Sequence, residues 1–545
     1  MAVMSGGEVL VGSLVQEGVG VVFGLPGVQL MGALDAFYRH QDEVRWITVR
    51  NEQSATYMAY SYARTTGRLG VAMVVPGPGA LNAAAGLGTA YAASTPVLLL
   101  SGQVETGDLG RDRGALHEVG EQMDVFRPIT KACSRVLKVR DIPATMHSSV
   151  CLAQNGRPRP VEMEVPWDVL DAEAEVEPLK PEPFSQPELD VAGVRAAARQ
   201  ISAARHLIIW AGGGVVTADG SAELTALAHR LNAPVVTTQQ GKGAIAEDDP
   251  LSVGVFYTNF GPARHILPQA DVVLAVGSRL LLPQGTPWAL RDDQELIQID
   301  VDPDEVGRNQ PVQLGVVGDA KRVLAALLDE VGDGGKSAWH LQELEAVRAR
   351  VRREVEALAP TQLAIIDALR QELAPDAVVV QGVTNVAYWA NVAFPVLRPR
   401  SYVTSSYFAS LGYGFPAALG AKVGNPQRQV VALCGDGGFM YGVPELATAV
   451  QENINVVALV FVDNALGASR HDQQRRFGSR FLGTRLHNPS FARLAEEFGA
   501  RGILVAEPEE VGSALREALA CKRPVVIEVP LPTLTPPFQA TPPDV

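Results

Sequence analysis

The sequence predicts an α/β fold made of three doubly wound domains with mainly parallel sheets. Three observations support this fold class: short apolar segments alternate with helical segments, two aspartates directly follow such apolar segments, and one octapeptide occurs twice in similar form. Alternating strands and helices are typical of parallel sheets covered by helices. A chain of 545 residues has room for about three domains of ordinary size.

The first domain is expected to span residues 1–170. Its apolar segments have the β-branched character of buried strands, and the segments between them have helical spacing. Strands are expected within VGVVFGLPG (19–27), RWITVRN (45–51), GVAMVVPGPG (70–79) and PVLLLSG (96–102), and helices over residues 52–67 and 80–94.

The middle domain is expected over residues 190–335, between two segments of different composition. An acidic, proline-containing stretch from Asp171 to Asp190 is interpreted as a linker, and a charged segment with helical periodicity covers about residues 337–358. Strands are expected within HLIIWAGGG (206–214), PVVTTQQG (234–241), DVVLAVGSR (271–279) and ELIQIDVD (295–302).

The third domain, residues 360–545, contains two acids at the ends of predicted strands. Asp436 follows the run VVALC and one glycine, and Asp463, 27 residues later, follows NVVALVFV. A strand, helix, strand unit forms a right-handed crossover that brings the carboxyl ends of both strands side by side. Two convergent carboxylates beside glycine-rich backbone suit a hard divalent cation that carries phosphate.

The repeated octapeptide indicates an internal duplication. RPVEMEVP from Arg159 and RPVVIEVP from Arg523 agree at six of eight positions. Each copy follows a helical stretch and closes its own α/β domain. The first and third domains are therefore interpreted as similar, and the middle domain as divergent.

The composition excludes several classes of protein. The net charge of −14 without a basic run argues against nucleic acid and anionic membranes as partners. The four cysteines form no CxxC pair, which argues against zinc, a redox dithiol or a disulfide framework. No apolar run approaches the length of a membrane span. A cytoplasmic protein in a reducing compartment is expected.

The ordered set of motifs resembles the thiamine-diphosphate-dependent enzyme family, especially its acetolactate synthase and benzaldehyde lyase branch. The most specific motif is Gly435-Asp436-Gly437, followed after 24 residues by Val462-Asp463, where the family usually has Asn-Asn. The other motifs are FGLPG, RNEQSATYMAYSYARTTG, GPGALN, VLLLSGQV, FRPITK, QGKGAIAEDDPLSVG and SLGYGFPAALGAKVGNP. The resemblance covers the whole chain and implies a pyrimidine-binding first domain and a diphosphate-binding third domain.

The resemblance implies a Mg²⁺ ion that joins the cofactor diphosphate to the protein. Its expected ligands are the side chains of Asp436 and Asp463 and the main-chain carbonyl of Ala465. Asn464 becomes the second ligand if the strand ends one residue later. The extra negative charge of Asp463, compared with the usual amide, is expected to be tolerated because the ion dominates the local field.

The resemblance also implies roles for residues around the cofactor rings. Glu52 is expected to hydrogen-bond the aminopyrimidine ring nitrogen, although a helix-starting acid alone is more often structural. Leu411 is expected to bend the cofactor between its two rings, and His117, where related enzymes usually have Gln, to reach the reacting carbon. The expected cofactor-binding residues are Gly24, Pro26, Gly27, Glu52, Pro78, Asn82, Thr384, Asn385, Ala409, Leu411, Gly435, Asp436, Gly437, Gly438, Asp463, Gly467 and Ala468.

FAD in the middle domain is not favoured. Some acetolactate synthases hold FAD there and others hold none. The segment after Arg279 reads LLLPQ, where flavin-binding relatives tend to be acidic. An empty scaffold domain is therefore expected.

The resemblance implies an enzyme that makes or breaks a C–C bond next to a carbonyl. The first choice is decarboxylation of a 2-oxo acid such as pyruvate, followed by ligation to a carbonyl acceptor. The alternative is an acyloin lyase acting on a 2-hydroxy ketone. A 2-hydroxyacyl-CoA lyase or a silent cofactor-binding subunit is less favoured. The active unit is expected to be a homodimer or homotetramer with sites at the subunit interface.

Overall fold

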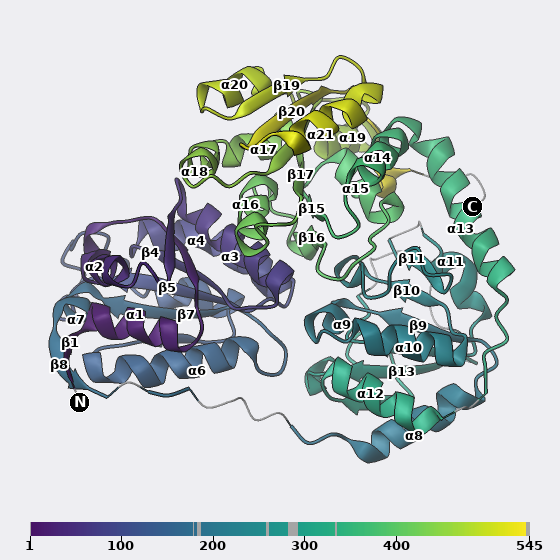
Figure 1. Ribbon diagram of the computed structural model, residues 1–545, viewed down its shortest axis with the longest axis horizontal. Helices are drawn as coiled ribbons and strands as arrows, with labels where there is room; N and C mark the ends of the chain where they lie inside the picture. Colours follow the sequence, from purple (N-terminus) through teal and green to yellow (C-terminus); the bar gives the residue numbers. More distant parts are fainter. Residues whose placement is uncertain are drawn as a thin grey trace.

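The computed structural model describes residues 2–177, 179–181, 187–257, 261–281, 291, 293–332 and 335–540. Within these residues the chain forms three six-stranded sheets whose strands all run parallel. Figure 1 shows the first domain in purple and blue on the left, the middle domain in teal on the lower right, and the third domain in green and yellow above them. The predicted fold class is confirmed.

The first domain has the strand order β3-β2-β4-β5-β7-β6. The side chain of Asn51 caps helix α3 by accepting the Gln53 N–H at 2.9 Å, and the helix ends at Gly67, whose φ of 76° suits glycine. The strands are β1 (Ala2–Ser5), β2 (Val21–Gly24), β3 (Arg45–Thr48), β4 (Gly70–Val74), β5 (Val97–Gln103), β6 (Cys133–Arg135), β7 (Val161–Pro166) and β8 (Glu173–Val176). The helices are α1 (Gly6–Gln16), α2 (Met31–Arg39), α3 (Glu52–Thr66), α4 (Pro78–Ala92), α5 (Met123–Phe126), α6 (Ile142–Gln154) and α7 (Trp167–Asp171).

The middle domain has the order β11-β10-β9-β12-β13-β14. Counted along the domain, this is the order 3-2-1-4-5-6 of dinucleotide-binding folds. The strands are β9 (Leu207–Ala211), β10 (Val235–Thr237), β11 (Ser252–Val255), β12 (Val272–Val276), β13 (Glu295–Asp300) and β14 (Leu314–Val317). The helices are α8 (Val191–Ala203), α9 (Gly213–Thr217), α10 (Ser221–Leu231), α11 (Ala263–Ile266) and α12 (Ala320–Val331).

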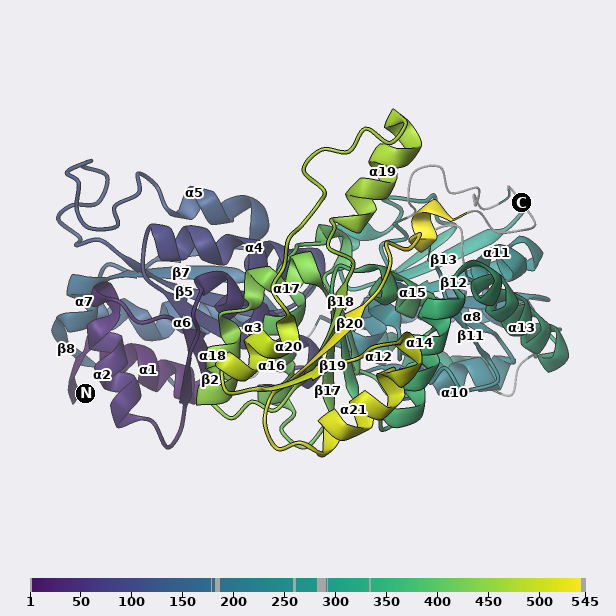
Figure 2. The same ribbon diagram turned by 90° about the horizontal axis from the view of Figure 1, so that it is seen from above.

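The third domain has the order β16-β15-β17-β18-β20-β19. The strands are β15 (Val378–Gln381), β16 (Tyr402–Thr404), β17 (Val430–Gly435), β18 (Val457–Val462), β19 (Arg501–Leu504) and β20 (Val525–Pro530). The helices are α13 (Leu341–Leu358), α14 (Pro360–Glu372), α15 (Asn385–Ala393), α16 (Gly414–Gly424), α17 (Asp436–Gly442), α18 (Glu445–Gln451), α19 (Gly467–Phe477), α20 (Phe491–Glu497) and α21 (Val511–Ala520). Figure 2 shows α19 projecting from the body of the molecule.

The first and third sheets have the same topology, which supports the duplication. When the strands of each sheet are numbered along the chain, starting with β2 in the first sheet and β15 in the third, both sheets have the strand order 2-1-3-4-6-5. The two copies of the octapeptide contain β7 and β20, which occupy the same place in this order. The middle sheet follows a different order, as its divergent sequence indicates.

The segment after residue 170 differs from the predicted linker. Strand β8 (Glu173–Val176) pairs antiparallel with β1 (Ala2–Ser5) and closes the first domain with a two-stranded sheet. This pairing joins residues that lie far apart in the chain, so the local acidic composition did not predict it. Residues 178 and 182–186 of the predicted linker lie outside the described residues. The predicted charged helix is confirmed as α13 (Leu341–Leu358).

The first and third domains share one hydrophobic core. Helix α3 packs against α16, and nearly all of its side chains are buried. The Tyr60 hydroxyl donates to the carbonyl of Thr404 at 2.5 Å, and the Tyr57 hydroxyl lies 2.5 Å from Ser410 Oγ. Among the described residues, no helix combines the length and apolarity needed to cross a bilayer.

Candidate active site

A cavity opens at the carboxyl edge of the third sheet. Its volume is about 230 Å³, and it lies where the strands β15, β17, β18 and β20 end. Helices α15, α17 and α19 begin at this cavity, so their positive N-terminal ends suit a bound phosphate. The expected residues that line it are Thr384, Asn385, Leu411, Gly435, Asp436, Gly437, Gly438, Asp463, Ala465, Gly467 and Ala468.

The two expected metal-ligating acids lie at the ends of neighbouring strands. Asp436 begins α17 after β17, and Asp463 follows β18, which pairs with β17. The Asp436 carboxylate accepts the N–H of Gly437 at 2.8 Å and the N–H of Asn464 at 2.8 Å. Burial raises the pKa of Asp436 to about 6, and the Asp463 charge adds to this rise. Burial also raises the pKa of Asp463. A divalent cation would offset the cost of holding both charges together.

The second expected metal ligand is one of the two residues that follow β18, Asp463 or Asn464. Asp463 and Ala465 line the cavity, whereas Asn464 does not. The Asn464 carbonyl accepts the Leu486 N–H at 2.8 Å, and its side-chain oxygen accepts from Asn488 Nδ2 at 3.2 Å. Because Asp463 lines the cavity and Asn464 does not, the geometry favours Asp463.

Asn488 contacts Asp436, one of the two expected metal ligands, although no sequence motif indicated a role for it. Its Nδ2 donates to Asp436 Oδ2 at 2.9 Å. Asn488 ends the phrase GTRLHN, which belongs to the segment that follows α19. Only the fold brings this segment back to β17, so no local pattern indicated the contact.

Glu52 lies at the carboxyl edge of the first sheet. It begins α3 just after β3, is 8% exposed, and its Oε2 accepts from Asn82 Nδ2 at 3.0 Å. The buried Glu445 of α18 accepts the backbone N–H groups of Arg50 and Asn51 at 3.0 and 3.1 Å, which fixes the start of α3 to the third domain. The structure thus brings together Glu52 and Asn82, two of the expected cofactor-binding residues.

Other expected cofactor residues of the first domain lie at the same edge. Gly24 ends β2, and Pro26 and Gly27 follow it. Pro78 begins α4 after β4. Strand β2 lies between β3 and β4 in the sheet, so these residues flank Glu52 on neighbouring strands.

Glu52 is separate from the cavity of the third domain within one chain. The residues that line that cavity all belong to the range 383–536, and none comes from the described part of the first domain. The structure therefore places the expected cofactor residues in two groups, one around Glu52 and one around Asp436, and each group is called a half-site. Exposed apolar side chains flank both halves: Val28, Leu81 and Leu116 in the first domain, Met440 and Tyr441 in the third.

The segment after β16 supplies the residues expected at the cofactor rings. Leu411 lines the cavity, and its Cδ2 lies 3.8 Å from the position that a Cβ on Gly438 would take. Ala409 has a left-handed backbone with a φ of 48° and is exposed. The neighbouring Ser410 holds this segment to Tyr57 of α3.

His117 lies in the loop between β5 and α5, next to the turn that precedes α4. Its φ of 68° is left-handed, a conformation that non-glycine residues adopt rarely and often at functional sites. Its carbonyl lies against Gly77, where a Cβ would come within 2.4 Å of it. Within the described part of the chain, the buried Nδ1 of His117 has no hydrogen-bond partner. His117 is thus near the Glu52 half-site, with one ring nitrogen unused.

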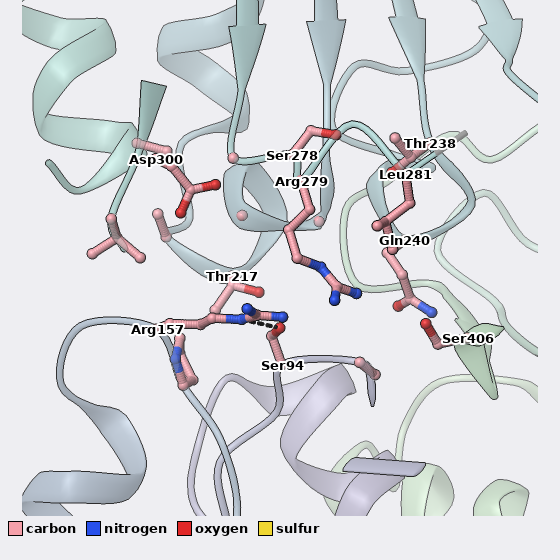
Figure 3. A pocket seen from close by; sticks show the side chains of 18 of the residues that line it. Ser94, Arg157, Thr217, Thr238, Gln240, Ser278, Arg279, Leu281, Asp300 and Ser406 are labelled. Carbon is pink, nitrogen blue, oxygen red and sulfur yellow. Dashed lines mark hydrogen bonds between the residues drawn. The ribbon is translucent and has the colours of Figure 1, made fainter. Parts of the chain in front are cut away.

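A larger cavity, of about 590 Å³, lies at the carboxyl edge of the middle sheet. Figure 3 shows the guanidinium groups of Arg157 and Arg279 extending into it, with Asp300 at the end of β13 to one side. Arg157 Nε donates to Ser94 Oγ at 2.9 Å, and Nη1 donates to Glu305 at 2.6 Å. Burial raises the pKa of Asp300 to about 6.

These residues suit the diphosphate and a ribose of a dinucleotide such as FAD. Guanidinium groups bind diphosphate, and an acid at a strand end suits a ribose hydroxyl. The LLLPQ segment, which argued against FAD, lies mostly in residues 282–290, outside the described residues. The absence of FAD stays a prediction, and the cavity provides no support for an empty scaffold.

Comparison with known proteins finds three family models along the chain. Residues 4–125 match the "Thiamine pyrophosphate enzyme, N-terminal TPP binding domain", residues 194–327 the central domain, and residues 382–529 the C-terminal TPP binding domain. The chain belongs to the thiamine pyrophosphate enzyme family. This enzyme family uses thiamine diphosphate, the cofactor that the resemblance in the sequence implied.

Relatives of this thiamine-diphosphate-dependent enzyme cover nearly the full chain. A probable acetolactate synthase large subunit of Methanocaldococcus jannaschii is 33% identical over 96% of this chain and 92% of its own length. The acetolactate synthase large subunit of Haemophilus influenzae is 33% identical over 96% and 94%. A probable 2-ketoarginine decarboxylase of Pseudomonas aeruginosa is 35% identical over 95% and 92%. The enzyme is therefore related to acetolactate synthase.

Proposed function

We propose that this enzyme uses thiamine diphosphate and Mg²⁺ to decarboxylate a 2-oxo acid and ligate the product to a carbonyl acceptor. The observation that carries the proposal is the pair Asp436 and Asp463 at the ends of adjacent parallel strands, inside a cavity that three helices face with their N-terminal ends. Asp436, Asp463 and the Ala465 carbonyl would hold the ion, and the helix ends would hold the diphosphate.

The chain's own groups would position and activate the cofactor. When bound, thiamine diphosphate supplies a carbon nucleophile that attacks the substrate carbonyl. Glu52 would hold a proton at the aminopyrimidine ring nitrogen, and Asn82 orients its carboxyl group through the 3.0 Å hydrogen bond. Leu411 would separate the two rings, and the Ala409 carbonyl would accept from the amino group. His117 would hold or donate a proton at the substrate oxygen.

Two observations support the proposed substrate class: the activities for which the relatives are named, and the small residues that line the cavity at the start of α19. One relative is named as a decarboxylase of a 2-oxo acid, 2-ketoarginine, and others are named as acetolactate synthases. At the start of α19, the small residues Ala468 and Ser469 line the cavity and leave room for an acceptor. An acyloin lyase remains the second candidate, because this small pair resembles benzaldehyde lyase.

A substrate panel separates these two functions. The enzyme, with thiamine diphosphate and magnesium, is incubated with individual 2-oxo acids and, separately, with individual 2-hydroxy ketones. Release of CO₂ from a 2-oxo acid is the expected result. Aldehyde release from a 2-hydroxy ketone without any CO₂ from the acids would favour the lyase instead.

We propose that the active unit is at least a homodimer. Each chain holds Glu52 outside its own diphosphate cavity, so a second copy must supply the missing half-site. The exposed apolar side chains Val28, Leu81, Leu116, Met440 and Tyr441 flank the two halves, which is typical of an interface. Sedimentation under assay conditions should show a dimer or tetramer whose activity falls on dilution. Full activity in a sedimenting monomer would contradict the shared site.

A further inference from the structure

Gln122 connects the buried core of the first domain to the turn that precedes α4. It is 1% exposed, and its Oε1 accepts the Gly77 N–H at 2.8 Å. Its Nε2 donates to Glu164 Oε2 at 3.0 Å, and to Ser101 Oγ and the Gly102 carbonyl at 3.1 Å each. Every hydrogen-bonding atom of this side chain is therefore engaged, and the bonds extend to two strands, β5 and β7, and one turn.

The turn held by Gln122 contacts both expected active-site residues of the first domain. Gly77 lies against the His117 carbonyl, and its φ of 58° requires glycine. Two residues later, a Cβ on Gly79 would lie 3.3 Å from Glu52 Oε1. The helix that begins at Pro78 carries Asn82, which donates to Glu52. A shift of this turn would thus move the surroundings of Glu52 and His117 together.

A second glutamine holds the His117 loop from the other side. Gln29 is buried, and its Nε2 donates to the Leu116 carbonyl at 3.1 Å. Leu116 and His117 are therefore fixed between the Gln29 amide and the Gly77 turn. The left-handed backbone of His117 needs such support, because it costs about 1 kcal/mol or more.

We propose that Gln122 is a positioning residue that fixes the Pro76–Gly79 turn and, through it, the orientation of Glu52 and His117. This inference rests on the proposed function, because it assigns Gln122 to the half-site that Glu52 forms there. Gln122 touches no cofactor or substrate position itself. It acts through the single hydrogen bond from Gly77.

The alternative is that Gln122 only satisfies a buried acid. The side chains of Glu162 and Glu164 are fully or almost fully buried, and burial raises the pKa of both. Arg135 pairs with Glu164, and the Gln103 Nε2 donates to the same Glu164 oxygen as Gln122, at 3.2 Å. Gln103 is about as buried as Gln122, but its Oε1 accepts the Val104 N–H rather than that of Gly77. It therefore offers a matched control.

The first experiment compares Gln122→Leu with Gln103→Leu in the protein without cofactor. Both changes remove a donor to Glu164, but only Gln122→Leu removes the acceptor of the Gly77 N–H. Hydrogen–deuterium exchange of peptides covering residues 76–82 and 115–119 is the measurement. Gln122→Leu should speed exchange in both segments at least 10-fold, and Gln103→Leu should leave it unchanged. Equal exchange in the two variants would overturn the proposal, whatever the enzyme's reaction.

The second experiment measures the consequence for the loaded enzyme. Gln122→Leu should lower C2 proton exchange of bound thiamine diphosphate and kcat by roughly 10- to 100-fold, because small displacements of catalytic groups have such effects. Cofactor affinity should change little, since the diphosphate cavity lies in the third domain. If wild type is active and Gln122→Leu has the same C2 exchange rate and kcat, the positioning role is contradicted. A wild type without C2 exchange would instead contradict the proposed function.

Gln122→Glu keeps the proposal testable if the leucine variant fails to fold. This change keeps an acceptor for Gly77 but places a carboxyl group against Glu164, near Glu121, Glu162 and Arg135. Protonated, the new carboxyl group can still donate to Glu164, and deprotonated it repels Glu164. The variant should therefore lose kcat as the pH rises, in a range where wild type does not. A pH profile that matches wild type would contradict the role of Gln122.

Discussion

Asp436→Ala should abolish binding of thiamine diphosphate in the presence of magnesium. Asp436 is 2% exposed and lies at the N-terminal end of α17, where the carboxylate accepts two backbone N–H groups. Its removal takes away the charge that would join the ion to the protein, and the diphosphate then faces Asp463 without a bridging cation. Helix N-termini alone contribute about 1 kcal/mol each, too little to replace a metal ligand. Isothermal titration calorimetry with magnesium present is the measurement.

Asp463→Asn is the matched control for this prediction. It keeps a side-chain oxygen at the same position and restores the amide that similar enzymes carry, so binding should be close to wild type. The change also removes the repulsion that contributes to the raised pKa of Asp436. Wild-type affinity in Asp436→Ala would exclude Asp436 as the metal ligand. Complete loss in Asp463→Asn would show that the second ligand is assigned wrongly.

The fold was predictable where local patterns repeat along the chain. Alternating apolar and helical segments indicated parallel sheets, and the octapeptide copies at β7 and β20 marked equivalent strands of two similar domains. The antiparallel pairing of β8 with β1 was not predictable, because it joins Ala2–Ser5 to Glu173–Val176 without a turn between them. The shared core of α3 and α16 likewise depends on contacts between domains.

The site was predictable where each residue follows a strand directly. Asp436 and Asp463 follow adjacent strands, so strand-end position indicated both of them, whereas Glu52, which starts the helix after β3, was indicated by the family resemblance. Asn488 and Gln122 reach the site from loops, and their contacts depend on the tertiary fold. The middle cavity also escaped the sequence analysis, since Arg157 enters it from the first domain and Arg279 from the second.

Glu52→Gln should slow proton loss at the cofactor C2 carbon while the cofactor still binds. The amide keeps the size of the carboxyl group and the contact with Asn82, but it cannot share a proton with the aminopyrimidine ring nitrogen. General acid–base contributions of this kind are typically about 10²–10⁴-fold, so C2 exchange should fall by about that factor. Affinity should persist because the diphosphate cavity is lined by the third domain.

His117→Ala should lower turnover without slowing proton loss at C2. His117 lies beside the turn at Gly77, its Nδ1 has no partner among the described residues, and its proposed role is to act on substrate rather than on the cofactor ring. Its removal should leave C2 exchange nearly unchanged and lower turnover of the best 2-oxo acid. Quenched-flow NMR of the C2 proton measures the first quantity, and steady-state rates measure the second. If Glu52→Gln exchanges C2 as fast as wild type, Glu52 does not activate the cofactor; if His117→Ala turns over normally, His117 only supports the loop. If C2 exchange falls only in Glu52→Gln, and turnover falls in His117→Ala while its C2 exchange is normal, cofactor activation belongs to α3 and substrate chemistry to the loop after β5.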